Sequence, residues 1–181
     1  MTYPVKISSI GGHFLFDDDQ QTPNTQIAAF EFDEGGKKLQ LEFEVRHGIT
    51  NHEAGIGVES GGQITVGDIV YGSNGYMTID NRDSYRTFLG KKQEPGPGRS
   101  ESGDNWANFI QAVRSRKAPD QNADIEGGCV TAALIHLAQI SYRLGRTLHF
   151  DPKALTCTGD EEANRMLTRN YRAPFVVPAE V

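Results

Sequence analysis

The segment HGITNHE, residues 47–53, contains side chains whose types and spacing are compatible with metal binding or acid–base catalysis. It contains His47, His52 and Glu53, and two imidazoles beside a carboxylate can bind a metal ion or act as acid and base. The two histidines are five residues apart, which is not the i, i+4 spacing of a helical zinc motif, and the surrounding glycines favour a loop. Metal binding, substrate contact and a solvated loop are therefore the three interpretations of this segment.

Arg46 ends a predicted strand immediately before this loop. An arginine at a strand end, beside a long loop, is well placed to bind an anion or a hydroxyl group. The other interpretation is an ion pair with a glutamate of the same sheet, Glu42 or Glu44. We take Arg46, Asn51 and His52 as candidate substrate-binding residues, and we assign no catalytic, cofactor-binding or metal-binding residue.

Other motifs that carry chemistry are missing from the sequence. No serine lies in a G-x-S-x-G segment, no glycine-rich turn joins a strand to a helix, and the two cysteines, Cys129 and Cys157, lack the spacing of a zinc site or a disulfide framework. The Asp17–Asp19 triplet lacks the pattern of a calcium loop, which favours a solvated turn. His136 and His149 are predicted to be hydrogen-bonded core residues, because each lies in an apolar pattern.

The overall charge argues against several classes of partner. The chain has 181 residues and a net charge of −6, and no run of like charges is longer than the aspartate triplet. This balance disfavours nucleic acid and anionic membrane surfaces as partners. No apolar stretch is long enough to span a bilayer, and the first residues contain no apolar signal segment. We therefore expect a cytoplasmic protein that contacts neither nucleic acid nor membrane.

The first half of the chain, about residues 3–90, is predicted to form strands. In KLQLEFEV, residues 38–45, apolar and polar side chains alternate, so one face of this strand is apolar and we expect helices to cover it. The turn residues DEGG separate this strand from residues 25–32, which predicts an antiparallel hairpin. A second hairpin is predicted to turn at residues 73–75, and residues 48–67 are predicted to form a long loop.

The second half is predicted to be helical. Residues 91–103 are rich in proline, glycine and serine and predict a mobile connector, helices follow over about 104–168, and 169–181 form a C-terminal arm. An apolar i, i+3, i+4, i+7 stripe marks the first helix, and Asp124 and Gly145 bound the second. Strands followed by helices predict one α+β domain over residues 1–181, an open and mostly antiparallel sheet with helices on one face.

Several motifs, in order, resemble the C-terminal half of the Gfo/Idh/MocA-type oxidoreductases, the relatives of glucose–fructose oxidoreductase and inositol dehydrogenase. They are DIVYGSNGYMTID, GDNWANFIQAVRSRK, NADIEGG, ISYRLGRTLHFDP and NYRAPFVVP, and the resemblance extends from Tyr3 to Val181. It implies an open antiparallel sheet that shapes a substrate pocket and a sheet face that forms a homo-oligomer interface. It also implies an N-terminal Rossmann domain that binds NAD or NADP, and hydride transfer to or from a sugar or polyol.

The sequence departs from that family pattern. The glycine-rich dinucleotide fingerprint, the Glu-Lys-Pro motif and the Asp-x-x-x-His segment have no counterpart here. Hydride transfer needs a bound nicotinamide and a positioned acid–base group. We therefore expect a fragment without the Rossmann domain, which binds no cofactor and is inactive alone. The alternative is a stand-alone scaffold module that binds a carbohydrate or a protein.

Overall fold

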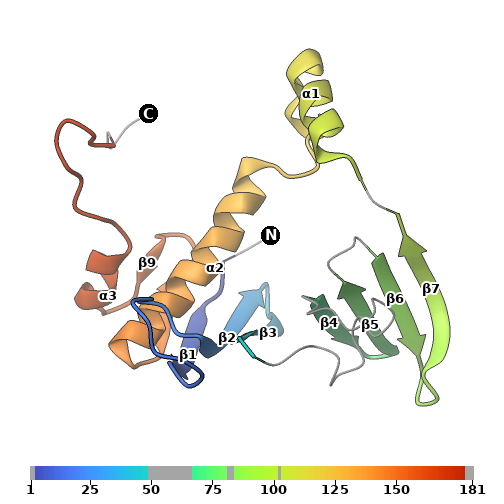
Figure 1. The fold of residues 1–181 in the computed structure, drawn as a ribbon, viewed down its shortest axis with the longest axis horizontal. Coiled ribbons are helices and arrows are strands. Elements are labelled where there is room, and N and C mark those ends of the chain that lie inside the picture. Colours follow the sequence, from blue (N-terminus) through green and yellow to red (C-terminus); the bar gives the residue numbers. More distant parts are fainter. Residues whose placement is uncertain (1–2, 49–66, 81–83, 102, 178–181) are drawn as a thin grey trace. The chain divides into compact units, whose positions relative to one another are not determined.

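A computed structural model describes residues 3–48, 67–101 except 81–83, and 103–177. It divides into two compact units, which are described separately. The helix-covered unit consists of Met1–Arg46 and Ala123–Val181, and the meander unit consists of His47–Asn122. Both units contain antiparallel sheets and helices (Figure 1), which confirms the predicted α+β class. The strands are divided between two sheets, where the sequence predicted one.

The sheet of the helix-covered unit has five strands in the order β3-β2-β1-β8-β9. The strands are β1 (Lys6–Gly12), β2 (Thr25–Glu34), β3 (Lys37–Arg46), β8 (Leu148–Asp151) and β9 (Thr156–Cys157). All neighbouring pairs are antiparallel. At the centre of the sheet, β1 thus pairs with β8, a strand more than 130 residues later in the sequence.

The β2–β3 hairpin confirms the prediction from DEGG. Its last pair is Glu34 with Lys37, so the turn residues are Gly35 and Gly36, at φ 62° and 88°. A two-residue turn with both φ angles positive matches the twist of the flanking strands, and glycine adopts it without strain. The backbone N–H of Gly36 also donates to Asp33 Oδ1 at 3.0 Å, which fixes the turn from the preceding strand.

The long helix α2 (Ile125–Leu144) packs on β1. The side chain of Asp124 caps its start, and Gly145, at φ 64°, ends it as predicted. The short helix α3 (Glu161–Met166) follows β9. The core of the unit lies between α2 and the sheet, and its largest fully buried apolar side chains are Phe30, Ile7, Leu137 and Leu148.

The apolar face of β3 corrects one expectation. Phe43 and Leu41 pair with Ala28 and Phe30 of β2, which are buried in the core. Phe43 and Leu41 therefore lie on the same face of the sheet as the core. They are nevertheless 49% and 41% exposed. The reason is position, because α2 packs on β1, whereas β3 is the edge strand two places away. No described residue of the helix-covered unit covers this face of β3.

The meander unit contains a four-stranded sheet in the order β4-β5-β6-β7. Its strands are β4 (Gly67–Gly72), β5 (Gly75–Asp80), β6 (Ser84–Leu89) and β7 (Glu94–Ser100), and each pairs antiparallel with the next. The predicted turn between β4 and β5 is confirmed. Rings from three of these strands form a row, in which Tyr76 and Phe88 stack with centroids 4.8 Å apart.

The predicted connector over residues 91–103 is wrong in part, because β7 occupies its middle. Pro95 and Pro97 lie in this strand, although proline has no N–H to donate to a ladder. Their presence is compatible with a strand because β7 is an edge strand, where donors on one side need no partner. The ladder is also irregular between Arg86 and Phe88, opposite the proline-containing segment.

The meander unit ends in α1 (Asn105–Ser115) and a 3₁₀ turn, η3 (Ala118–Asp120). Asp104 Oδ1 accepts from the N–H of Ala107 at 3.0 Å and caps α1 as predicted. The Asn108 side chain donates to the carbonyl of Asp120 at 2.7 Å and accepts from the N–H of Asn122 at 3.0 Å. One amide therefore holds the turn against the helix.

Candidate functional site

Arg46 is the last residue of β3, at the strand end where the sequence predicted it. Its Nε lies 3.1 Å from Glu44 Oε2, and its side chain is one-third exposed. The two residues are two positions apart, so they share a face of the strand. The ion pair between Arg46 and Glu44, which was the other interpretation of Arg46, is thus present in the structure. The substrate-binding role of Arg46 stays a prediction.

The other two candidate residues, Asn51 and His52, lie outside the described residues, as does Glu53. The structure therefore does not test whether they meet Arg46. His47 is described and is exposed directly after β3. In the part of the chain that the structure describes, no three His, Cys, Asp or Glu side chains gather where they could hold a metal ion.

His149 and His136 correct the prediction of core histidines, because both are exposed. In β8, Leu148 and Phe150 are buried and His149 between them points to the other face, as strand alternation requires. Cys157 is buried, and burial raises the pKa of its thiol, which disfavours the reactive thiolate. Neither cysteine forms a disulfide.

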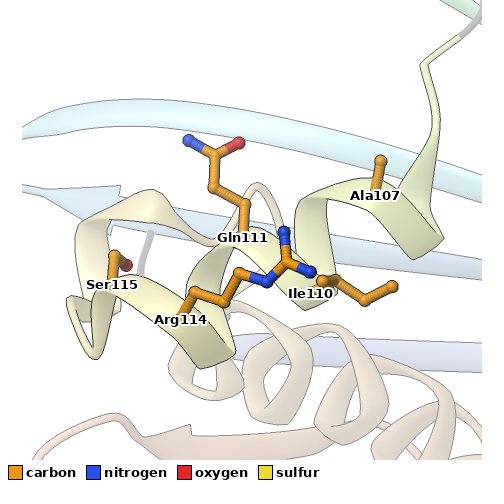
Figure 2. A pocket seen from close by; sticks show the side chains of 5 residues that line it. All are labelled: Ala107, Ile110, Gln111, Arg114 and Ser115. Atoms are coloured by element: carbon orange, nitrogen blue, oxygen red, sulfur yellow. The ribbon is translucent and has the colours of Figure 1, made fainter.

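A shallow groove of about 610 Å³ runs along α1. Figure 2 shows its lining, in which the Arg114 side chain reaches back along the helix toward Ile110. The predicted apolar stripe of this helix shares Ile110 with the groove and is exposed, from 43% at Val113 to 74% at Trp106. The sequence identified the stripe correctly, but no described side chain of the meander unit buries it.

A second hollow, of about 450 Å³, lies in the helix-covered unit between β1 and the end of α2. We call it the β1 notch, and its lining residues are Ser8, Ser9, Ile10, Gly11, Tyr142, Gly145, Arg146 and Thr147. None of these residues was predicted from the sequence as a site residue. Their only signal was the pair of hydroxyls at Ser8 and Ser9, which in a strand is compatible with an ordinary solvent-facing edge.

An ion cluster lies at one side of the β1 notch. Arg146 Nε and Nη2 each donate to Asp160 at 2.9 Å, and Nη2 also donates to Glu162 at 2.8 Å. These hydrogen bonds raise the pKa of Arg146. The hydrogen bonds that Asp160 accepts from Arg146 and from the backbone N–H of Ala163 lower the pKa of Asp160 to about 2. The cluster ties the connection after α2 to the first turn of α3.

We expect the Asp160 carboxylate to make stability depend on acid pH. Because its pKa is lower in the folded chain than its ordinary 3.8, its contribution is complete above that value and is lost as pH falls toward about 2. Asp160→Asn should lower the melting temperature at pH 7 and weaken the acid-induced decrease, since asparagine can still cap α3 but carries no charge.

Thermal denaturation followed by circular dichroism at several pH values measures this effect. Glu161→Gln is the matched control, since this neighbouring carboxylate is exposed and makes no ion pair with another described residue. Equal pH profiles for wild type and Asp160→Asn would contradict the assignment of acid sensitivity to Asp160.

The described residues form two antiparallel sheets, one of which carries α2 on one face, and this is an α+β architecture. Residues 90–177 match the family described as the oxidoreductase family, C-terminal alpha/beta domain. Over residues 90–177 the chain matches a Gfo/Idh/MocA-type C-terminal domain, which confirms the resemblance for that part of the chain. No curated protein matches the chain. No described helix is long and apolar enough to cross a membrane.

Proposed function

We propose that this chain is the substrate-side part of an NAD(P)-dependent oxidoreductase that acts on a sugar or polyol. The observation that carries the proposal is the match of residues 90–177 to the C-terminal domain of the oxidoreductase family. In this proposal, the domain shapes a substrate pocket and a Rossmann domain outside these residues holds the nicotinamide. The choice between NAD and NADP belongs to that domain.

Arg46, Asn51 and His52 are the proposed substrate contacts. Arg46 supports this role by its place, because it is the last residue of β3. A guanidinium at a strand end can donate two hydrogen bonds to neighbouring hydroxyls. Its ion pair with Glu44 would hold the side chain in position for such contacts.

Association of copies through the outer face of the sheet also belongs to this proposal. That face of β3 carries Gln40, Glu42, Glu44 and Arg46, and neighbouring β2 residues include the half-exposed Ile27. A mixed polar and apolar face of this kind is compatible with a specific interface. Homo-oligomerisation itself stays a prediction.

The test of the proposed function is a titration of the full chain with NADH, followed by nicotinamide fluorescence. We expect no saturable change at micromolar chain concentrations, because the sequence contains no glycine-rich turn to hold the pyrophosphate. A Rossmann-containing dehydrogenase measured in the same buffer serves as the positive control. Saturable micromolar binding, or oxidation of a polyol by this chain alone, would contradict the proposal.

A further inference from the structure

The strand β3 (Lys37–Arg46) lies at one edge of its sheet, and β2 is its only strand partner among the described residues. We call the side of β3 that points away from β2 the free edge. Natural sheets commonly protect such an edge by shortness, proline or a bulge, because its N–H and C=O groups can pair with another strand. β3 is ten residues long, contains no proline and pairs with β2 without a register shift, so it has none of these three protections.

The other edge strands of the described residues differ from β3. β9, at the opposite edge of the same sheet, has two residues. In the meander unit, β7 contains Pro95 and Pro97, and β4 has six residues. β3 is the longest of the four edge strands, so it is the strand best suited to extend its sheet with a further strand.

The side chains of β3 add a reason for such an extension. Leu39, Leu41 and Phe43 lie on one face of the strand and are 61%, 41% and 49% exposed. Neighbouring strands of a sheet lie about 4.8 Å apart, so a strand added at the free edge would place its own side chains directly beside these three. An added strand with apolar residues at the facing positions would therefore remove apolar surface from water.

The sequence of β3 matches its own reversed sequence in one antiparallel register. When Leu41 lies opposite Leu41 of a second copy, Leu39 lies opposite Phe43, Gln40 opposite Glu42 and Lys38 opposite Glu44. Each of these unlike pairs occurs twice, because a two-fold axis relates the copies. Apolar residues then meet on one face, and on the other face an amide and an ammonium group meet carboxylates, which are favourable cross-strand pairs.

The neighbouring registers are less favourable. Centring the pairing on Glu42 places this carboxylate opposite itself and Lys38 opposite Arg46, so that like charges face each other. Centring it on Gln40 pairs only Lys37–Phe43 and places the Lys37 ammonium group beside a phenyl ring. A shift by a single residue places apolar side chains opposite charged ones. The register centred on Leu41 is thus the one that the charges select.

We infer that β3 is a dimerisation strand, through which two copies of this chain pair antiparallel at their free edges with Leu41 at the centre. The pairing joins two sheets into one continuous sheet and gives the edge N–H and C=O groups of β3 hydrogen-bond partners. The partner is a second copy because the charges and apolar residues of β3 complement those of β3 itself. This contact uses the free edge rather than the outer face of the sheet, and it does not depend on the proposed function.

Sedimentation equilibrium of the full chain over a concentration series tests the pairing. The buffer contains a reductant, since Cys129 is exposed. We expect the average mass to rise from 19.9 kDa toward twice that mass. Lys38→Glu and Glu44→Lys should each raise the dissociation constant about tenfold, because each places like charges opposite in two pairs. An equimolar mixture of the two variants should recover dimers, because the mixed dimer has a glutamate opposite a lysine in both pairs.

Hydrogen exchange at low and high chain concentration identifies the surface that associates. We expect the β3 amides to gain protection as concentration rises, whereas the amides of β7 (Glu94–Ser100) should not change. Ile27→Ala is the control variant, because Ile27 is 46% exposed on the outer face of β2 and is not a residue of the edge strand. It should dimerise as the wild type does.

Four results would overturn the inference: a monomer at every concentration, no recovery of dimers in the mixture, a dimer without added protection of β3, or loss of the dimer in Ile27→Ala. The last two would show that another surface associates. These outcomes are distinguishable from a failure of the proposed function. A monomer that binds no NADH would leave the substrate-side assignment standing, and saturable NADH binding would leave the pairing of β3 standing.

Discussion

Leu137→Ala is expected to destabilise the helix-covered unit by about 2–5 kcal/mol. Leu137 is 2% exposed and belongs to the cluster that joins α2 to the sheet. Truncating it removes apolar surface from the core and leaves a cavity, which neighbours on a helix and a sheet fill only in part. Native-state hydrogen exchange of the β1 and β2 amides measures the loss in this unit directly.

Ile135→Ala is the matched control for this prediction. Ile135 lies on the same helix, but it is 61% exposed, so its truncation should change stability by no more than about 0.5 kcal/mol. The comparison separates the loss of core packing from any change in the helix itself, since both variants place alanine in α2. Similar losses in the two variants would show that α2 does not pack as described.

Gly75→Ala is expected to disrupt the pairing of β5 with β6. Gly75 has φ 149°, a conformation that costs other residues about 1–3 kcal/mol. A Cβ at this position would also lie 2.0 Å from the carbonyl oxygen of Phe88, so backbone must shift. We expect fast hydrogen exchange across β5 and β6, and a loss of the ring-current shifts that the stacked Tyr76 and Phe88 produce.

Gly72→Ala is the control in the same hairpin. The added Cβ would meet its nearest neighbour, the carbonyl oxygen of Gly75, at 3.7 Å, which is ordinary van der Waals contact. It should therefore leave the exchange rates of β5 and β6 close to those of the wild type. If Gly75→Ala behaved like this control, the close approach of β5 and β6 at Phe88 would be incorrect.

The elements that the sequence predicted well are those specified by neighbouring residues. Alternation over residues 38–45 and the glycines after Asp33 and Glu34 specify the β2–β3 hairpin, and Asp124 and Gly145 specify both ends of α2. The strand β7 was missed because its prolines and glycines resemble a loop, and only its place at a sheet edge makes a strand possible. The residue pattern within a strand does not show whether that strand lies at the edge of its sheet.

Burial was harder to predict than the elements themselves. The stripe of α1 and the alternation in β3 show which side is apolar, but they do not show what covers it. Likewise, Arg46 could be proposed from its strand end, whereas the β1 notch depends on where β8 stops pairing with β1, more than 130 residues away in the sequence. The residue spacing within β1 or within β8 does not indicate where the two strands pair.

The β1–β8 pairing also has a consequence for biosynthesis. Lys6 pairs with His149, so the central strand of the helix-covered unit obtains its second neighbour only after residue 149 has left the ribosome. The meander, by contrast, joins strands in their order of translation and closes short loops. Nascent chains that stop before residue 148 would therefore contain the complete meander, and also the strands β1, β2 and β3, of which β1 still lacks its partner β8.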